Sequence, residues 1–268
     1  MTTYPVSVFI MDVSNSSKEN MGGELSNYLQ QLEKTISLWT KDIRTTKVIH
    51  RSGDELVVIS SGYATAYTLA FYISRVWKFN NHKPYFGLSF GDIQNEVHTL
   101  NIETWIHPLM KQARHANDLL KQKGQNRSQF NFALDQFYAT NYSENNYHLY
   151  RSEFELLINT ILTLQQHHIN QQTNIQSLVC SLFLILQQQN KVGDYIGRSA
   201  STISSHMKKG NCEEIIAAFN NIVQVMDSLQ TNLDSFSDIK PQTANDHLQN
   251  NIKSTINKHI HDYFVINK

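Results

Sequence analysis

The chain has few cysteines, no excess charge of either sign and no long apolar run. Cys180 and Cys212 are too few for a disulfide framework or a four-ligand zinc site, and their apolar helical surroundings favour buried free thiols. Lys and Arg together number 23, as do Asp and Glu, so no global field attracts nucleic acid or membrane. No run approaches the roughly 18 apolar residues of a membrane span, and no cationic stretch precedes one near Met1. We therefore expect a cytoplasmic protein without a membrane segment.

The 268 residues, 40% of them hydrophobic, are enough for two modules with real cores. In the first half, short β-rich runs alternate with helical patterns in the order β-α-β-β-α-β-α-β. This order predicts a sheet containing antiparallel strands with helices packed on it, a ferredoxin-like arrangement, over residues 1–145. The overall prediction is an α+β fold.

Every pattern in the second half has helical period, which predicts an all-α domain over residues 146–233. Within it we expect a helix-turn-helix at 191–209 and a long helix of dimerisation type at 213–233. Residues 234–268 are expected to form a loosely packed C-terminal tail with one amphipathic segment.

Two carboxylates in the first domain could form a metal site. Asp12 directly follows the first strand, and Asp54 lies in a hairpin turn between the next two. If the first strand neighbours this hairpin, both carboxylates emerge at the same end of the sheet. Two hard anionic ligands so placed suit Mg²⁺ or Mn²⁺ on a triphosphate. The alternative is that Asp12 caps a loop or helix and Asp54 merely suits a tight turn.

These segments resemble the class III nucleotide cyclase and diguanylate cyclase domains over about residues 5–120. Asp12 and Gly53-Asp54 are similar to the family's metal carboxylates, Gly87-Leu-Ser-Phe-Gly91 to its Gly-x-x-x-Gly strand, and Ala113-Arg114 to the helix with its phosphate-binding arginine. The resemblance implies a metal- or nucleotide-binding domain in which Arg114 would be catalytic if the protein is an enzyme.

Two positions depart from the cyclase pattern. His50 stands where such cyclases place a base-reading lysine, and Met110 where they place an asparagine. Methionine cannot donate to a ribose or phosphate, and histidine is only partly charged at neutral pH. We therefore expect the metal carboxylates to remain while efficient cyclisation is lost.

The segment 191–209 has the pattern of a helix-turn-helix. Gly193 is small where two helices must cross closely, Gly197 suits a tight turn with positive φ, and Ser199 can cap the second helix. The segment holds four Lys or Arg residues and one Asp, a local charge of +3. Small hydroxyls and lysines allow a helix to enter the major groove and contact phosphates. The candidate DNA-binding residues are Arg198, Ser199, Ser201, Thr202, Ser204, Ser205, Lys208 and Lys209. The alternative is an ordinary helical hairpin with a polar face.

Both halves together resemble the SatD family of bacterial proteins, in which a cyclase-like N-terminal domain precedes a helix-turn-helix. The residues that carry this resemblance include Asp12, Gly53-Asp54-Glu55, Ala113-Arg114 and the turn segment, over about residues 5–210. The resemblance implies the architecture and DNA binding rather than a reaction. It adds Glu55 to Asp12 and Asp54 as a candidate ligand of Mg²⁺ or Mn²⁺.

Apolar residues in 213–233 recur at steps of four and three, from Ile215 through Phe219, Ile222 and Met226 to Leu229. Such a seam suits a homodimer that would read a palindromic DNA site, or burial within the same subunit. Three functions stay open. The first is a transcriptional regulator that binds double-stranded DNA and senses a nucleotide or metal ligand. The second is a metal-dependent nucleotidyl cyclase or related phosphoryl-transfer enzyme with a helical regulatory module. The third is a protein-interaction scaffold.

Overall fold

The computed structural model describes residues 3–14, 22–51, 53–79, 81–124, 127–134, 151–233 and 240–264. They form a mixed α+β structure around one five-stranded sheet in the order β2-β3-β1-β4-β5. Neighbouring strands are antiparallel, except that β5 runs parallel to β4. The strands are β1 (Tyr4–Val13), β2 (Thr46–His50), β3 (Leu56–Ser61), β4 (Pro84–Ile93) and β5 (Phe130–Phe132).

The sheet is covered by helices on both faces, which explains why β1 is an almost continuous apolar run. Phe9 and Met11 belong to the cluster that includes α1 (Gly22–Thr40) and α2 (Thr65–Arg75). Val8 and Ile10 point the other way, into the cluster beneath α3 (Pro108–Gln122). A short 3₁₀ turn, η1 (Val97–Thr99), lies between β4 and α3 in the sequence.

Helix α3 lies directly against the backbone of β4 at Gly87. A Cβ on this residue would lie 2.1 Å from the carbonyl oxygen of Ala113 and 2.3 Å from the backbone nitrogen of Asn117. The Asn117 amide nitrogen also donates a hydrogen bond to the Ile10 carbonyl oxygen at 2.8 Å. A glycine at this point is therefore required for the close approach that fixes α3 on the sheet.

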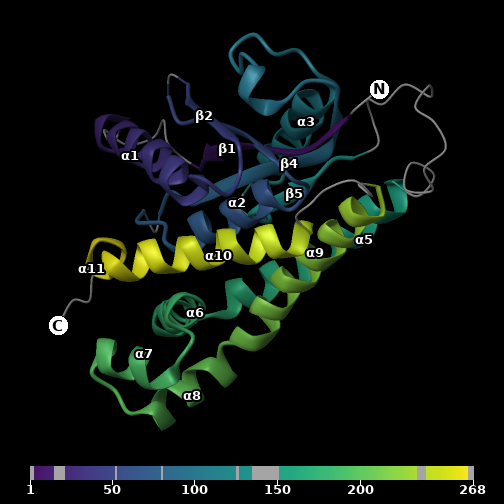
Figure 1. Cartoon of the computed structure of the whole chain (residues 1–268). Coiled ribbons are helices and arrows are strands. Elements are labelled where there is room, and N and C mark those ends of the chain that lie inside the picture. The colour runs from purple at the N-terminus through teal and green to yellow at the C-terminus, as the bar shows by residue number, and fades with distance from the viewer. Residues whose placement is uncertain are drawn as a thin grey trace.

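The second half is helical and packs on the α1/α2 side of the sheet (Figure 1). Phe219 of the second half stacks on Phe71 of α2 with ring centroids 4.1 Å apart. One continuous cluster of buried hydrophobic residues spans both halves. Its helices are α5 (Arg151–Gln171), α6 (Asn174–Leu186), α7 (Gln189–Ile196), α8 (Ala200–Lys209), α9 (Cys212–Leu233), α10 (Pro241–Lys258) and α11 (Ile260–Tyr263).

The expectation of a loosely packed tail over 234–268 is wrong for residues 240–264. Helix α10 lies between the sheet-bearing half and α6 (Figure 1), and Leu248, Ile252 and Ile256 are fully buried along one stripe. Their spacing of four residues is that of the amphipathic segment expected in this region, but the spacing alone could not show that the rest of the chain covers it. The Asn251 amide nitrogen further donates to the Trp39 carbonyl oxygen of α1 at 2.8 Å.

The sequence left two roles open for the seam of α9, a dimer interface or burial within the same subunit, and the structure shows burial. Ile215, Phe219, Ile222 and Met226 are buried inside this chain, where α9 packs against α5, α2 and α10. Periodicity identified the seam correctly, but it cannot tell which surface covers it. The proposed domain boundary near residue 145 lies outside the described residues.

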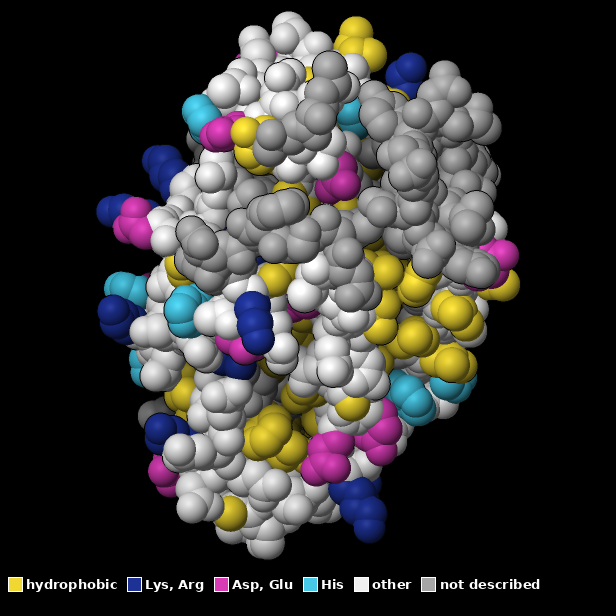
Figure 2. Space-filling view, turned by 45° about the vertical axis from the view of Figure 1, so that its right-hand side comes forward, with side chains coloured by type: hydrophobic (Ala, Val, Ile, Leu, Met, Phe, Trp, Pro, Cys, Tyr) yellow, Lys and Arg dark blue, Asp and Glu magenta, His cyan; other side chains and the backbone are white. Residues whose placement is uncertain are grey.

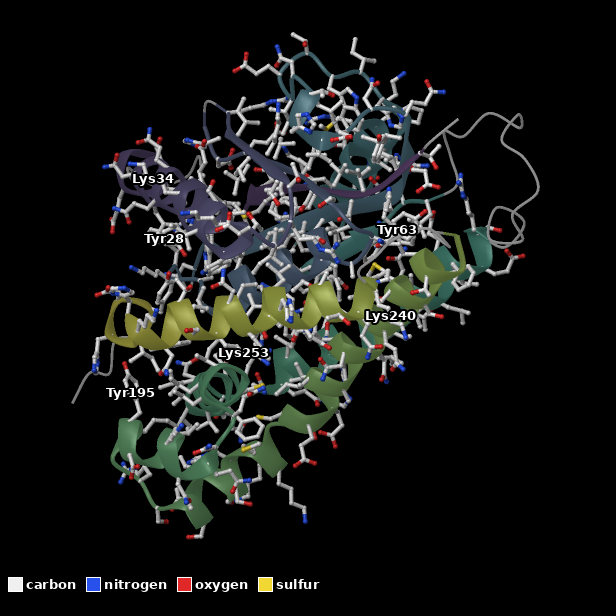
Figure 3. The ribbon with its side chains drawn as sticks, viewed as in Figure 1. Tyr28, Lys34, Tyr63, Tyr195, Lys240 and Lys253 are labelled. Atoms are coloured by element: carbon white, nitrogen blue, oxygen red, sulfur yellow. The ribbon has the colours of Figure 1, made fainter. Side chains whose placement is uncertain are left out.

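Two tyrosines tie the helical half to distant parts of the chain (Figure 3). The backbone N–H of Tyr63, beside α2, donates to the Gln230 side-chain oxygen of α9 at 3.0 Å. The Tyr195 hydroxyl of α7 donates to the Phe264 carbonyl oxygen at 2.7 Å, and its ring stacks on His261. Of the helices in the described ranges, none is both long and apolar enough to cross a membrane.

Candidate functional site

The structure brings Asp12 and Asp54 together, as their sequence positions predict. Asp12 is the last residue but one of β1, and the register of β1 with β3 pairs Met11 with Leu56. The hairpin turn that carries Asp54 therefore lies beside the end of β1. The two carboxyl groups are within hydrogen-bonding contact of each other.

The Asp12 carboxyl group is electrostatically strained. Burial raises its pKa, and the hydrogen bond and negative charge of Asp54 raise it further, to about 6. The Val13 backbone N–H donates to one Asp12 oxygen at 2.9 Å, and the Lys121 ammonium lies 3.7 Å from the other. Hydrogen bonds from the Val13 N–H and from Tyr85 offset only part of the effect of burial and of Asp54, so the pKa of Asp12 stays well above its ordinary value.

Glu55 faces two arginines instead of the carboxylate pair. The Arg114 guanidinium donates to both Glu55 oxygens, at 2.7 and 3.1 Å, and Arg51 donates to one of them at 3.2 Å. Burial alone would raise the pKa of Glu55, but the hydrogen bonds and charges of Arg114 and Arg51 lower it. The structure therefore places Arg114 in an ion pair and does not bring Glu55 to Asp12 and Asp54 as a third ligand. Within the described residues, no group of three or more His, Cys, Asp or Glu side chains could hold a metal ion.

The two positions that depart from the cyclase pattern do not reach into this site as ligand-reading groups. The His50 ring nitrogen Nε2 lies 3.2 Å from the Gly53 carbonyl oxygen of its own hairpin. Met110 lies in the first turn of α3 and is buried with the apolar residues between this helix and the sheet.

Sequence reasoning missed two neighbours of Asp12. Lys121 lies seven residues after Arg114 on α3, so the helical period could have placed both on one face. Tyr85 lies opposite Asp12 in the register of β1 and β4, and the Arg127 guanidinium lies 4.4 Å from its ring centroid. Burial and the adjacent Asp12 raise the pKa of the Tyr85 hydroxyl. Only the strand pairing reveals this tyrosine.

The segment α7–α8 has the local geometry that its sequence predicts. Gly197 ends α7 with φ +73°, and Ser199 caps α8 by accepting a hydrogen bond from the Thr202 backbone N–H at 3.3 Å. A Cβ at Gly193 would lie 2.5 Å from the Arg198 carbonyl oxygen, so the turn folds tightly against α7. Ile203 and Met207 bury the inner face of α8.

The outer face of α8 is polar and accessible at the end of the molecule farthest from the sheet (Figure 1). Most of the predicted DNA-binding residues are exposed, and only Thr202 is half-buried: the exposed ones are Arg198, Ser199, Ser201, Ser204, Ser205, Lys208 and Lys209. Exposed Glu213 and Glu214 open α9 directly after this unit. They reduce the charge of residues 191–214 to +1, from four Lys or Arg and three Asp or Glu. The exposed basic residues are thus Lys191 on α7, Arg198 just before α8, and Lys208 and Lys209 at the end of α8.

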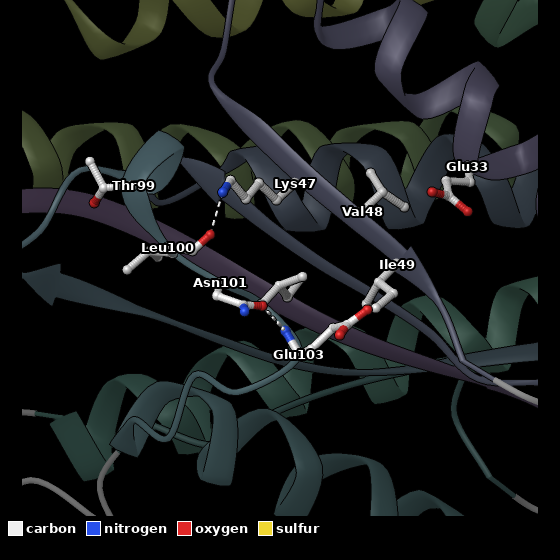
Figure 4. A pocket seen from close by; sticks show the side chains of 9 residues that line it. Glu33, Lys47, Val48, Ile49, Thr99, Leu100, Asn101 and Glu103 are labelled. Atoms are coloured by element: carbon white, nitrogen blue, oxygen red, sulfur yellow. Dashed lines mark hydrogen bonds between the residues drawn. The ribbon is translucent and has the colours of Figure 1, made fainter.

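Two surface features lie apart from the predicted residues. A pocket of about 560 Å³ opens beside edge strand β2, and Glu33 and Glu103 are among the residues that line it. At one side of this pocket the Lys47 ammonium donates to the Leu100 carbonyl oxygen (Figure 4). Its lining includes none of the residues singled out from the sequence. In Figure 2, hydrophobic side chains gather on one flank of the molecule. Exposed large hydrophobic residues of the helical half include Leu156, Leu157 and Leu164 on α5 and Val225 on α9.

Comparison with known proteins found no family model, no curated protein and no solved structure that matches this chain. The two features that bear on function are therefore the Asp12–Asp54 carboxylate pair and the exposed face of α8.

Proposed function

We propose that this protein is a transcriptional regulator that binds double-stranded DNA through α8. The observation that carries the proposal is an exposed, capped helix with hydroxyls along its outer face and lysines at its end, set on α7 by a glycine turn. A helix presented in this way can enter the major groove, where hydroxyls meet phosphates or base edges and ammonium groups neutralise phosphate. On this proposal, α7–α8 is a helix-turn-helix and the protein acts in the cytoplasm.

The sheet-bearing half is proposed to be a degenerate cyclase-like domain that senses a metal ion or nucleotide. Two antiparallel β neighbours of β1, with α1 and α2 on one face and α3 on the other, support a ferredoxin-like arrangement of the first four strands. This architecture, followed by the helical half, is what the SatD resemblance implies. The strain on Asp12 supports sensing rather than turnover, because a bound cation would relieve it while Arg114 is held by Glu55.

A homodimer remains part of the proposal because two recognition helices on a two-fold axis match a palindromic site. Its interface would have to lie outside the buried seam of α9. Light scattering of the full chain at micromolar concentration measures the subunit number directly.

The DNA-binding proposal is tested by combining Lys208→Ala with Lys209→Ala. Each phosphate contact that is lost removes about one released counterion, so the slope of log affinity against log salt should flatten by about two. The measurement is fluorescence anisotropy with mixed-sequence duplex DNA at several salt concentrations. Lys34→Ala with Lys41→Ala provides the matched control, since both of these lysines are exposed on or just after α1, which belongs to the sheet-bearing half (Figure 3 labels Lys34).

The control pair should leave the slope unchanged. If the Lys208/Lys209 variant keeps the wild-type slope, α8 does not contact phosphate and the proposal fails. If the wild type does not bind duplex DNA at low salt, the helical half serves another partner.

The second candidate function is a metal-dependent nucleotidyl cyclase or related phosphoryl-transfer enzyme. The contact between Asp12 and Asp54 favours it, because paired carboxylates are what Mg²⁺ or Mn²⁺ on a triphosphate requires. The test incubates the full chain with Mn²⁺ and ATP or GTP and measures products chromatographically. Turnover that is abolished by Asp54→Asn would establish this function, and Arg114 would then have to exchange Glu55 for phosphate.

A further inference from the structure

The two cysteines, 32 positions apart in sequence, meet in the core. Cys180 lies within α6 and Cys212 is the first residue of α9, and both are buried free thiols. Their side chains lie close enough to interact directly. The Gln172 amide nitrogen reaches the Cys212 sulfur at 3.9 Å and the Gly210 carbonyl oxygen at 2.6 Å. All residues of α7 and α8 lie between the two cysteines in the sequence.

A buried arginine accompanies this thiol pair. Arg75 of α2 is only 8% exposed, and its guanidinium interacts electrostatically with both cysteines. Its other partners are neutral: it donates to the Gln129 side-chain oxygen at 3.2 Å and to the Ser74 hydroxyl at 3.4 Å. The guanidinium nitrogen Nη1 is buried and has no hydrogen-bond partner in the described part of the chain.

A buried guanidinium is costly unless an anion compensates it. The described residues provide Arg75 with no carboxylate ion pair. The groups beside it that can become anions are the Cys180 thiol, the Tyr67 hydroxyl and the Cys212 thiol, and a thiol ionises more easily than a phenol. Cys212 also begins a 22-residue helix, whose N-terminal backbone N–H groups favour negative charge nearby. Two thiols in contact, beside an unpaired cation and a helix N-terminus, are the arrangement of a reactive pair rather than of inert core cysteines.

We propose that Cys180 and Cys212 form a redox-active dithiol, which hydrogen peroxide oxidises to an intramolecular disulfide. The hydrogen bond from the Cys212 thiol lowers the pKa of Cys180, burial opposes this effect, and the charge of Arg75 supports it. Cys180 is therefore the attacking sulfur and Cys212 the resolving one.

The reaction proceeds in two balanced steps. The Cys180 thiolate attacks one oxygen of the peroxide, the O–O bond breaks, and the other oxygen leaves as water after taking a proton, which gives a sulfenic acid. The Cys212 sulfur then attacks the Cys180 sulfur, the S–O bond breaks, and a second water leaves as the S–S bond forms. The two thiols lose two electrons, and the peroxide is reduced to water.

The product would join α6 to the start of α9 and close a loop around α7 and α8. Oxidation would thus hold the two ends of this unit together without requiring that it bind DNA. The proposal is independent of the function of α8.

The test exposes the reduced full chain to hydrogen peroxide and counts the thiols after denaturation. Trypsin separates the cysteines, because cleavage after Arg151, Lys191, Lys209 and Lys253 gives peptides 152–191 and 210–253, the Lys240–Pro241 bond being resistant. We expect both thiols to disappear together and the two peptides to be linked until a reductant is added. Cys180→Ser and Cys212→Ser are the matched controls, and neither should form the link. Persistence of both thiols, or oxidation of each to a sulfinic acid without a link, would overturn the proposal.

The role of Arg75 is tested by the pH dependence of thiol alkylation by iodoacetamide. In the wild type, alkylation should reach half of its maximal rate at a pH below about 8.5, the value that is typical of a free cysteine. Arg75→Gln should slow the reaction roughly tenfold at neutral pH, while Arg75→Lys retains most of the rate because it retains the charge. Circular dichroism verifies the fold of each variant. If Arg75→Gln does not fold, the wild-type midpoint decides, and a value at or above that of free cysteine contradicts the role of Arg75.

Discussion

Replacing Asp12 by Asn should stabilise the full chain at neutral pH. Burial and the neighbouring Asp54 raise the pKa of Asp12 from 3.8 to about 6 in the folded protein. At about 1.4 kcal/mol per pKa unit, ionised Asp12 therefore destabilises the fold by about 3 kcal/mol. The side chain of Asp12 is only 17% exposed, so solvent screening reduces this value little. An asparagine amide can still donate to Asp54 and accept from the Val13 N–H, while it removes the charge.

The penalty depends on pH in a defined direction. Below about pH 4, Asp12 is protonated in both the folded and the unfolded chain, so its raised pKa does not lower the free energy of unfolding. Between about pH 4 and 6 the unfolded chain releases this proton first, so the wild type loses stability relative to Asp12→Asn as the pH rises. Above about pH 6 the difference should level off near 3 kcal/mol.

Urea unfolding curves at half-unit steps from pH 4 to 8 measure this difference. Asp194→Asn, which changes an exposed carboxylate on α7, is the matched control and should track the wild type. If the free energies of unfolding of the wild type and Asp12→Asn differ by the same amount at every pH in this range, the prediction is refuted. Asp12 would then be neither strained nor coupled to Asp54.

Two further predictions concern packing. Gly87→Ala should destabilise the chain by about 3 kcal/mol or prevent folding, because its Cβ would meet backbone of α3 that cannot move aside, whereas Gly23→Ala, with nothing within 4 Å, should be tolerated. Thermal melts of both variants decide this, and an unchanged melting temperature for Gly87→Ala would contradict the close approach. Ile252→Ala should cost about 2–5 kcal/mol in chemical unfolding, because it opens a cavity beneath α10, while Ser254→Ala at an exposed position of the same helix should cost almost nothing. Equal effects of these two substitutions would mean that α10 is not docked.

The features that could be predicted from the sequence are those that depend on neighbours along the chain. The positive φ of Gly197, the Ser199 cap and the turn that carries Asp54 are set by a few adjacent residues. The convergence of Asp12 and Asp54 needed one tertiary assumption, that β1 lies beside the hairpin, and this assumption is correct.

The features that could not be predicted depend on which surfaces meet. The α9 pattern is the same whether Phe219 packs on a second subunit or, as here, on Phe71. The ion pair between Glu55 and Arg114 joins residues 59 positions apart and leaves no local pattern. The meeting of Cys180 with Cys212 and Arg75 likewise follows only from the packing of α6 and α9 against α2.

The position of α10 has a consequence for how the protein is made. This helix packs on α1, α2, α6 and α9, all of which precede it in the sequence. A ribosome therefore delivers the other surfaces first, with the apolar groove that will receive Leu248, Ile252 and Ile256 still open. Domains fold as they emerge, and exposed apolar surface on a waiting intermediate favours aggregation and chaperone binding. The nascent chain is thus exposed to aggregation and chaperone binding until α10 is synthesised and covers the groove.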